Sequence, residues 1–413
     1  MVWFEKRETL TAYDVFTPAR IPLDDKQTYV NREDAEGKLE ECFQSGLIPV
    51  VYGEYGVGKT TLVRRYFRNY PAESNVFLTI SAATTLPQVF QSVLEHIGYR
   101  VEVETTTKDI RNNSFGASAV VRGEIGETYG TEKTERIAVG SPTDAGLLKI
   151  MQKNEILLIL DEVHKATPEF KTELSHFIKA ARSDSSRFPL LVLTGTTMSP
   201  DELTSHDQGI GRYLKPVQVN PMTVGESRDL LQQGFGKLSM EHSQDLEERI
   251  VKIAAGAPSL LQEICLKMAL AASKATRNEV LPEDFEDAVR AYLREHEQSL
   301  TKQYIVSIEH SGPKRYRKQV LAAMSLIPKD YVSLEDIRLQ VTAQLGEFVP
   351  STTLSGPLQK LKAGSSSILV DFEDEVVQAS QILTMFRDPM MKSFIRFIRA
   401  AETENLLPDA ADI

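Results

Sequence analysis

The sequence has few of the residues that build disulfide frameworks, transition-metal sites or membrane spans. Its only two cysteines, Cys42 and Cys265, lie far apart and outside any metal-ligand spacing, which excludes a disulfide framework and indicates a reducing compartment. The seven histidines form no pair with zinc-ligand spacing. No run of about 18 apolar residues occurs, and the N-terminus MVWFEKRETL lacks the basic start and apolar stretch of a signal peptide. We therefore expect a cytoplasmic protein with no membrane partner.

The charge balance is acidic. The net charge is −11 over 413 residues, 41% of which are hydrophobic and 25% charged. These fractions are ordinary for a globular protein, and the length suffices for two or three domains. The acidic total gives no global support for nucleic-acid binding, although a local basic patch still permits it.

One glycine-rich stretch, GEYGVGKTT, has the spacing G-x-x-x-x-G-K-[ST] of a phosphate-binding loop. It follows the apolar run 48–52 and precedes a helix-favouring segment. Glycine lets backbone N–H groups approach a polyphosphate closely, and the start of the following helix favours negative charge. Lys59 would contact the β- and γ-phosphates of ATP, and the Thr60 hydroxyl would ligate Mg²⁺. The expected nucleotide-binding residues are Gly53, Glu54, Tyr55, Gly56, Val57, Gly58, Lys59, Thr60 and Thr61.

A second motif carries the chemistry of hydrolysis. The apolar strand 156–160 ends in Asp161 and Glu162. A carboxylate at that position would hold Mg²⁺, and an adjacent one would polarise the attacking water. We therefore predict Asp161 as a metal ligand and Glu162 as a catalytic residue.

Three further positions are candidates with open alternatives. Thr194 or Thr196, at the end of strand 189–197, could contact the γ-phosphate, but threonine is also common at strand ends. Arg212 could stabilise the phosphates of a neighbouring subunit or be a plain surface arginine. Pro258, at the start of a helix, could pack on adenine or simply begin that helix.

The order of elements predicts an α/β fold of the P-loop NTPase type. Apolar strands alternating with helices indicate a parallel sheet with helices on both faces, and the chemistry then lies at the strand ends. The strand 76–81 reads as buried. The predicted division is an N-terminal lead-in lying on the nucleotide domain (1–30), the ATPase core (31–220), a helical lid of four helices (221–310), a winged-helix-like domain (313–400) and a tail (401–413).

Two segments leave their role open. Residues 105–140 carry five basic and five acidic residues and form either a surface β-hairpin or a flexible, functional insertion. Residues 314–362 hold eight basic against four acidic residues, and three helices followed by two strands indicate a winged helix. Such a domain docks DNA or protein.

Together these residues resemble the AAA+ ATPases, and more narrowly the initiator-like ATPases related to origin-recognition and archaeal ATPase families; STAND-type ATPases are similar too. The matching parts are Asn31-Arg32-Glu33, GEYGVGKT, ILLILDE, LVLTGTT, Arg212, Gly256-Ala257-Pro258 and the winged-helix-like end. The resemblance covers about residues 30–400. The resemblance implies that the nucleotide lies between the ATPase core and the lid, that Glu162 is the catalytic base and that Arg212 is the arginine finger.

The resemblance has one departure. Many AAA+ lids carry a sensor arginine at the start of the helix beginning near 256, but this chain reads GAPSLLQE there. The departure favours a nucleotide-dependent switch over a fast motor. We expect a slow ATPase, a homo-oligomer, that acts on DNA or a DNA-associated complex. The alternative is a STAND-like signalling or defence switch that recruits a partner protein. A regulator that binds ATP or ADP without turnover is a third reading, against which the Asp-Glu pair argues.

Overall fold

The computed structural model describes residues 10–102, 136–139, 144–183, 190–196, 208–295, 300–308, 316–329, 331–364, 367–372 and 382–406. Residue contacts divide the chain into two compact units, each described by itself. The sheet unit comprises Glu33–Gly53 and Tyr66–Gln218, and the helical unit comprises Met1–Arg32, Glu54–Arg65 and Val219–Ile413. This division differs from the expected domain boundaries, since most of the phosphate loop groups with the C-terminal half of the chain.

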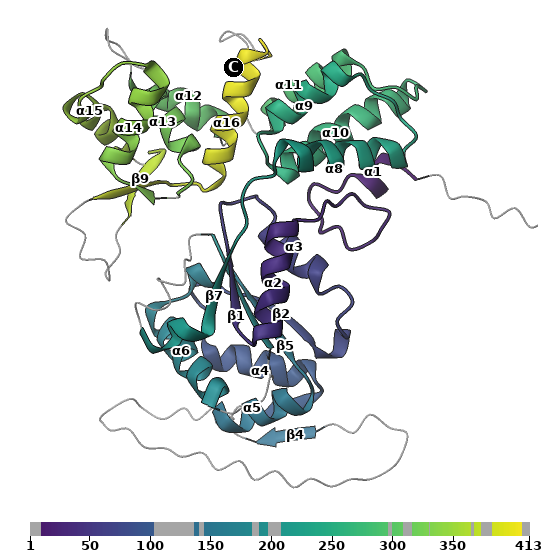
Figure 1. The fold of residues 1–413 in the computed structure, drawn as a ribbon, viewed down its shortest axis with the longest axis vertical. Coiled ribbons are helices and arrows are strands. Elements are labelled where there is room, and N and C mark those ends of the chain that lie inside the picture. Colours follow the sequence, from purple (N-terminus) through teal and green to yellow (C-terminus); the bar gives the residue numbers. More distant parts are fainter. Residues whose placement is uncertain are drawn as a thin grey trace, which may run out of the picture. The chain divides into compact units, whose positions relative to one another are not determined.

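The sheet unit is built on five parallel strands in the order β2-β5-β6-β1-β7 (Figure 1). The strands are β1 (Ile48–Tyr52), β2 (Asn75–Thr79), β5 (Leu157–Asp161), β6 (Leu190–Gly195) and β7 (Leu214–Gln218). Around them lie α2 (Glu33–Ser45), α4 (Leu86–His96), α5 (Asp144–Lys153) and α6 (Pro168–Ser183), with the short 3₁₀ helices η1 (Ala72–Ser74), η2 (Val163–Lys165) and η3 (Gln208–Tyr213). The predicted P-loop NTPase fold class is confirmed.

Burial follows each strand's place in the sheet. All five residues of β5 are buried, as expected for a strand with neighbours on both sides. In β2 only Val76 is buried, because β2 lies at the edge of the sheet. The expectation of a uniformly buried strand at 76–81 is therefore wrong, although Ile80 just beyond β2 is buried again.

The strand register brings the predicted catalytic positions to one edge. Leu160 of β5 pairs with Leu193 of β6, and Tyr52 of β1 pairs with Gly195 of β6. Asp161 and Thr194 follow the first pair directly, at the carboxyl ends of their strands. The chain also leaves β1 at that edge, through Gly53, towards the phosphate loop. This edge is where parallel α/β sheets bind their ligands.

The flanks of the insertion pair in parallel. β3 (Tyr99–Glu102) and β4 (Arg136–Val139) form a two-stranded parallel sheet. The pairing of β3, which precedes the predicted insertion, leaves both alternatives for 105–140 as predictions. Residues 103–135 and 140, which make up most of the predicted insertion, lie outside the described residues.

The helical unit contains the four helices predicted for the lid. They are α8 (Val224–Lys237), α9 (Gln244–Ala254), α10 (Pro258–Lys274) and α11 (Pro282–Glu295). The same unit also contains α1 (Ala12–Val15), α12 (Lys302–Ile308) and α3 (Lys59–Tyr66), except that the last residue of α3 belongs to the sheet unit. No helix of the described part has the length and apolar character needed to cross a bilayer.

The N-terminal lead-in packs against this helical unit. Val15 and Phe16 are buried in the apolar cluster that also contains Leu231 and Phe235 of α8. The Thr17 N–H donates to Gln262 Oε1 of α10 at 2.7 Å. The lead-in also contacts the expected ATPase core, because Arg65 of α3 donates to the Leu23 carbonyl oxygen and to Asp25 Oδ1, each at 2.9 Å. Its described residues therefore lie against both the lid helices and the helix that follows the phosphate loop.

The C-terminal region of the helical unit has three helices, a small sheet and a closing helix (Figure 1). Its elements are α13 (Tyr316–Leu326), β8 (Tyr331–Val332), α14 (Leu334–Leu345), α15 (Ser351–Lys362), β9 (Leu369–Phe372), β10 (Leu383–Phe386) and α16 (Met390–Thr403). The three strands pair antiparallel in the order β8-β10-β9. Phe397 of α16 packs edge-to-face on Tyr292 of α11 with ring centroids 4.9 Å apart.

Candidate nucleotide-binding site

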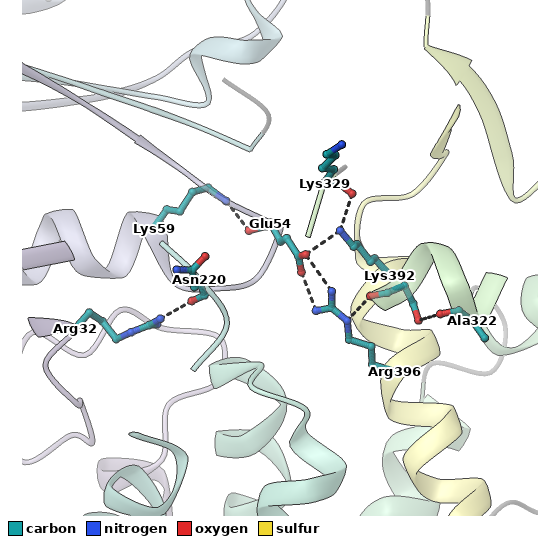
Figure 2. Close-up of polar contacts among 9 residues, drawn as sticks. Arg32, Glu54, Lys59, Asn220, Ala322, Lys329, Lys392 and Arg396 are labelled. Atoms are coloured by element: carbon teal, nitrogen blue, oxygen red, sulfur yellow. Dashed lines mark hydrogen bonds and ion pairs between the residues drawn. The ribbon is translucent and has the colours of Figure 1, made fainter. Parts of the chain in front are cut away.

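The phosphate loop adopts a conformation that requires its glycines. Gly56 and Gly58 have φ angles of +80° and +95°, in the left-handed region that side chains disfavour. The loop runs directly into α3, which begins at Lys59. Lys59 is buried, and its Nζ donates to the carbonyl oxygen of Glu54 at 2.8 Å (Figure 2). The lysine predicted to bind phosphate is thus bonded to its own loop.

A pocket opens beside this loop, within the helical unit. Its wall combines the loop, the lead-in and the first turn of α10, and includes Gly56, Val57, Gly58, Thr61, Arg32, Thr17, Pro258 and Gln262. Pro258 occupies the first position of α10. A Cβ built on Gly58 would lie 3.9 Å from Pro258 Cγ. The structure therefore brings Pro258 beside the loop, where its predicted contact with a nucleotide base remains a proposal.

Gly256, two residues before Pro258, has a structural role. Its φ is +77°, and its carbonyl oxygen accepts from the Met222 N–H at 2.8 Å. A Cβ there would lie 2.7 Å from the Met222 carbonyl oxygen. Glycine is thus required because the backbone before α8 passes so close.

Arg32 ties the phosphate loop to the start of α8. Its guanidinium donates to the carbonyl oxygen of Asn220 (Figure 2). It also donates to the carbonyl oxygen of Val57 at 3.1 Å and to Glu226 Oε1 at 2.9 Å. Glu226 also completes the capping box of α8 with Thr223. Sequence reasoning noted Arg32 only as part of a motif, since its partners lie 25 to 194 positions away.

The carboxyl edge of the sheet holds a compact polar group. Asp161 is buried, and its Oδ1 accepts hydrogen bonds from the Thr194 hydroxyl and, at 3.1 Å, from the Glu162 N–H. Glu162 has φ 62°, a left-handed conformation that is uncommon without glycine and often marks a functional position. The structure thus brings Asp161, Glu162 and Thr194 together, as the sequence predicted.

His164 is a member of this group that the sequence analysis missed. Its two ring nitrogens lie 3.2 Å from the Thr196 backbone nitrogen and 2.9 Å from Thr196 Oγ1. Glu162 Oε2 is 3.8 Å from His164 Nε2 and 2.7 Å from Lys165 Nζ. The signal was available, because His164 follows the Asp-Glu pair within three positions. Thr197 lies outside the described residues.

Arg212 lies apart from this group. It sits on η3 with an exposed side chain, donates to the Tyr213 hydroxyl at 2.6 Å and stacks over the Tyr213 ring at 4.7 Å. An exposed arginine on a neighbouring aromatic ring fits either of the two readings that the sequence left open.

Each unit by itself supplies a donor that suits a magnesium-bound nucleoside triphosphate. The donor is the Asp161 carboxylate in the sheet unit and the Thr60 hydroxyl in the helical unit, and both are hard oxygen ligands of the kind that Mg²⁺ prefers. Thr17, which lines the pocket, has a buried hydroxyl without a hydrogen-bond partner among the described residues. A polar ligand group in the pocket would satisfy such an atom.

Comparison with known proteins supports a nucleotide site. The family model of ATPase domains predominantly from Archaea matches residues 29–264, and no curated protein matches the chain. Among solved structures, Cdc6p from Pyrobaculum aerophilum is 15% identical with a TM-score of 0.46, covering 95% of this chain and 98% of its own. The ORC2 protein of Aeropyrum pernix is 13% identical with a TM-score of 0.47, covering 94% and 98%. A Walker-type ATPase of Pyrococcus abyssi is 16% identical with a TM-score of 0.46, covering 89% and 96%.

The matched segment contains the phosphate loop, the Asp-Glu pair and the Pro258 turn, and it confirms the resemblance to archaeal ATPases. Since it spans more than half of the sequence, the chain belongs to the family of ATPase domains found predominantly in Archaea.

Proposed function

We propose that this protein binds ATP with Mg²⁺ and hydrolyses it slowly, and that the bound nucleotide switches the arrangement and assembly of the chain. The observation that carries the proposal is the group at the carboxyl edge of the sheet. Asp161 there is held by Thr194, and Glu162 follows in a left-handed conformation. The strand that continues into the phosphate loop ends at the same edge.

Each residue then has a role on the nucleotide. The loop N–H groups and Lys59 would bind the β- and γ-phosphates, and Lys59 would exchange its hydrogen bond with the Glu54 carbonyl oxygen for one with a phosphate oxygen. Asp161 and Thr60 are the residues that would hold Mg²⁺, which would supply positive charge against these phosphates. Glu162 accepts a proton from the attacking water, while Thr194 or Thr196 orients the phosphate or the water.

Arg212 has its role in an oligomer. Its exposure suits a group that reaches the nucleotide of a neighbouring subunit and stabilises transferred charge. A homo-oligomer that forms only with ATP follows from this role, because each ligand stabilises the state that it binds better.

Sizing the protein by light scattering tests the switch. We expect a smaller species with ADP and a larger one with a non-hydrolysable ATP analogue. Lys59→Ala should remain small under both conditions and bind neither nucleotide. The same size for wild type with ADP and with the analogue would contradict the switch, while loss of binding only in Lys59→Ala would still support the site.

We propose DNA as the target of the switch. The three helices α13–α15 and the antiparallel β8-β10-β9 sheet are the kinds of element that make up a winged helix. Residues 314–362 of this region carry more basic than acidic residues. The phosphate backbone makes DNA binding strongly salt-dependent. A gel shift with duplex DNA and ATP analogue should therefore show a complex that weakens as salt rises. Absence of such a complex would favour the alternative, a signalling or defence switch that recruits a partner protein.

A further inference from the structure

Glu54, the second residue of the phosphate loop, is bound by two cations of the closing helix α16. Its carboxylate accepts from Arg396 Nη1 and Nη2 at 2.7 and 3.0 Å and contacts Lys392 Nζ at 2.8 Å (Figure 2). All three side chains are nearly inaccessible, with exposed fractions of 11% for Glu54, 13% for Arg396 and 4% for Lys392. The partners lie 342 positions apart in sequence.

The two cations are held in place by other contacts as well. Lys392 Nζ donates to the Lys329 carbonyl oxygen at 2.8 Å, and Arg396 Nε donates to the Ser325 carbonyl oxygen (Figure 2). Both carbonyls belong to the end of α13 and the turn after it. The cations are therefore positioned by the C-terminal region itself. Glu54 contacts them only when α16 lies against the phosphate loop, an arrangement that we call docked.

The negative charge of a glutamate inside a loop that binds polyphosphate must be compensated by nearby positive charge. The glutamate's negative charge opposes the phosphates, and in a buried setting this repulsion is poorly screened. Burial pulls the pKa of Glu54 upward, but the hydrogen bonds and charges of Arg396 and Lys392 outweigh burial and leave that pKa below its ordinary value. Glu54 is thus ionised at neutral pH, and the compensation comes from the cations rather than from a proton. With α16 docked, the three side chains sum to a charge of +1; without it, Glu54 alone contributes −1.

We propose that Lys392 and Arg396 are positioning residues for the nucleotide site, which neutralise Glu54 and so allow the phosphate loop to bind ATP only when α16 is docked. The inference rests on the proposed binding of ATP at this loop. Because coupling between two binding events is reciprocal, ATP also stabilises the docked α16. The position of the C-terminal region would then determine the net charge beside the bound phosphates, and with it the affinity for ATP.

Nucleotide affinity in charge variants tests this proposal. The probes are fluorescent analogues of ATP and ADP, titrated at low and high salt. We expect Lys392→Met with Arg396→Met to weaken binding of the ATP analogue at least about tenfold, because the summed charge beside the phosphates falls by two units, from +1 to −1. The loss should be smaller for ADP, which carries less charge, and smaller at high salt. Adding Glu54→Gln to the pair should restore binding, since no carboxylate then remains to be neutralised.

A matched control uses a second cluster of the same composition. Arg249 Nε and Lys252 Nζ of α9 contact Glu404, just after α16, at 3.0 and 2.9 Å. Arg249→Met with Lys252→Met also removes two cations from a carboxylate near the same helix, but away from the loop, and it removes the 3.7 Å contact of Arg249 with Glu286 as well. This control should bind both analogues like wild type. Equal weakening in the control, or a triple variant as weak as the double, would overturn the proposal.

Two further readouts keep the outcome decisive. If the double variant fails to fold, Glu54→Gln alone decides, because it should bind the ATP analogue at least as tightly as wild type; weaker binding would overturn the proposal. Amide hydrogen exchange of α16 should slow with the ATP analogue in wild type and change less in Glu54→Gln. If the wild type bound no nucleotide at all, the proposed function would be refuted instead. Lys59→Ala shows what the absence of nucleotide binding looks like in the same titration.

Discussion

Substituting alanine for Gly234 should loosen the lead-in that forms one wall of the nucleotide pocket. Gly234 lies within α8, where a Cβ would fall 2.2 and 2.3 Å from Cε1 and Cζ of Phe16 and 3.1 Å from Thr28 Cγ2. Phe16 cannot give way easily, because it is 1% exposed and packs edge-to-face on Phe235 at 5.4 Å. The added methyl group must therefore displace the ring.

The magnitude follows from two opposing effects. Overpacking a buried site costs about 1–3 kcal/mol. Replacing glycine by alanine within a helix returns up to about 1 kcal/mol. With the full gain the net change in the free energy of unfolding is a loss of about 0–2 kcal/mol, and relative to a glycine-to-alanine change without overpacking it is a loss of about 1–3 kcal/mol. Thr17, which follows Phe16, lines the pocket, so nucleotide affinity should fall as well.

Gly236 provides the control, because it lies in the same helix and a Cβ there meets nothing within 4 Å. Urea unfolding followed by circular dichroism should show Gly236→Ala as stable as wild type or up to about 1 kcal/mol more stable. Gly234→Ala should be less stable than both. Equal stability of the two variants would refute the reasoning that Phe16 closes over Gly234.

Three other outcomes are expected. Thr194→Val removes the hydroxyl that donates to Asp161; ATP turnover should fall about tenfold, because a hydrogen bond to a charged group contributes about 1.5 kcal/mol, and unchanged turnover would exclude that role. His164→Leu breaks the contacts to Thr196 and should lower turnover at saturating ATP while binding, measured by titration, is retained. Because the pKa of Glu54 is depressed in the folded protein, its ionised form adds stability that is present above the unfolded value of about 4.3 and is lost as the pH falls through the folded value. The difference in unfolding free energy between wild type and Glu54→Gln should therefore shrink below about pH 4, and a constant difference would contradict this linkage.

Elements with a strong local pattern were predictable from the sequence. α6 occupies the segment 168–183, whose apolar residues recur at helical spacing, and the apolar run before Asp161 forms the fully buried β5. In α6 these apolar residues form one buried face, and in β5 the continuous apolar run forms a buried strand. The phosphate loop and the Asp-Glu pair were equally visible, because their chemistry fixes residue types at fixed spacing.

Elements defined by distant partners were missed. β7 was not predicted as a strand because LKPVQ contains Pro216, which is tolerated at the sheet edge that β7 occupies. β8 is only two residues long and exists through its pairing with β10. The contacts of Glu54 with α16 leave no trace in local sequence, since either side chain alone reads as an ordinary surface charge.

The central claim is that the Asp-Glu pair makes this chain an ATP hydrolase. The most direct test is to compare Glu162→Gln with wild type in ATP binding and in steady-state release of phosphate. The side chain lies beside His164 and Lys165, and the isosteric amide keeps its shape while removing the basic oxygen. We predict wild-type affinity for ATP together with turnover at least a hundredfold lower, the order expected for loss of a general base. Turnover of Glu162→Gln at the wild-type rate would contradict the account.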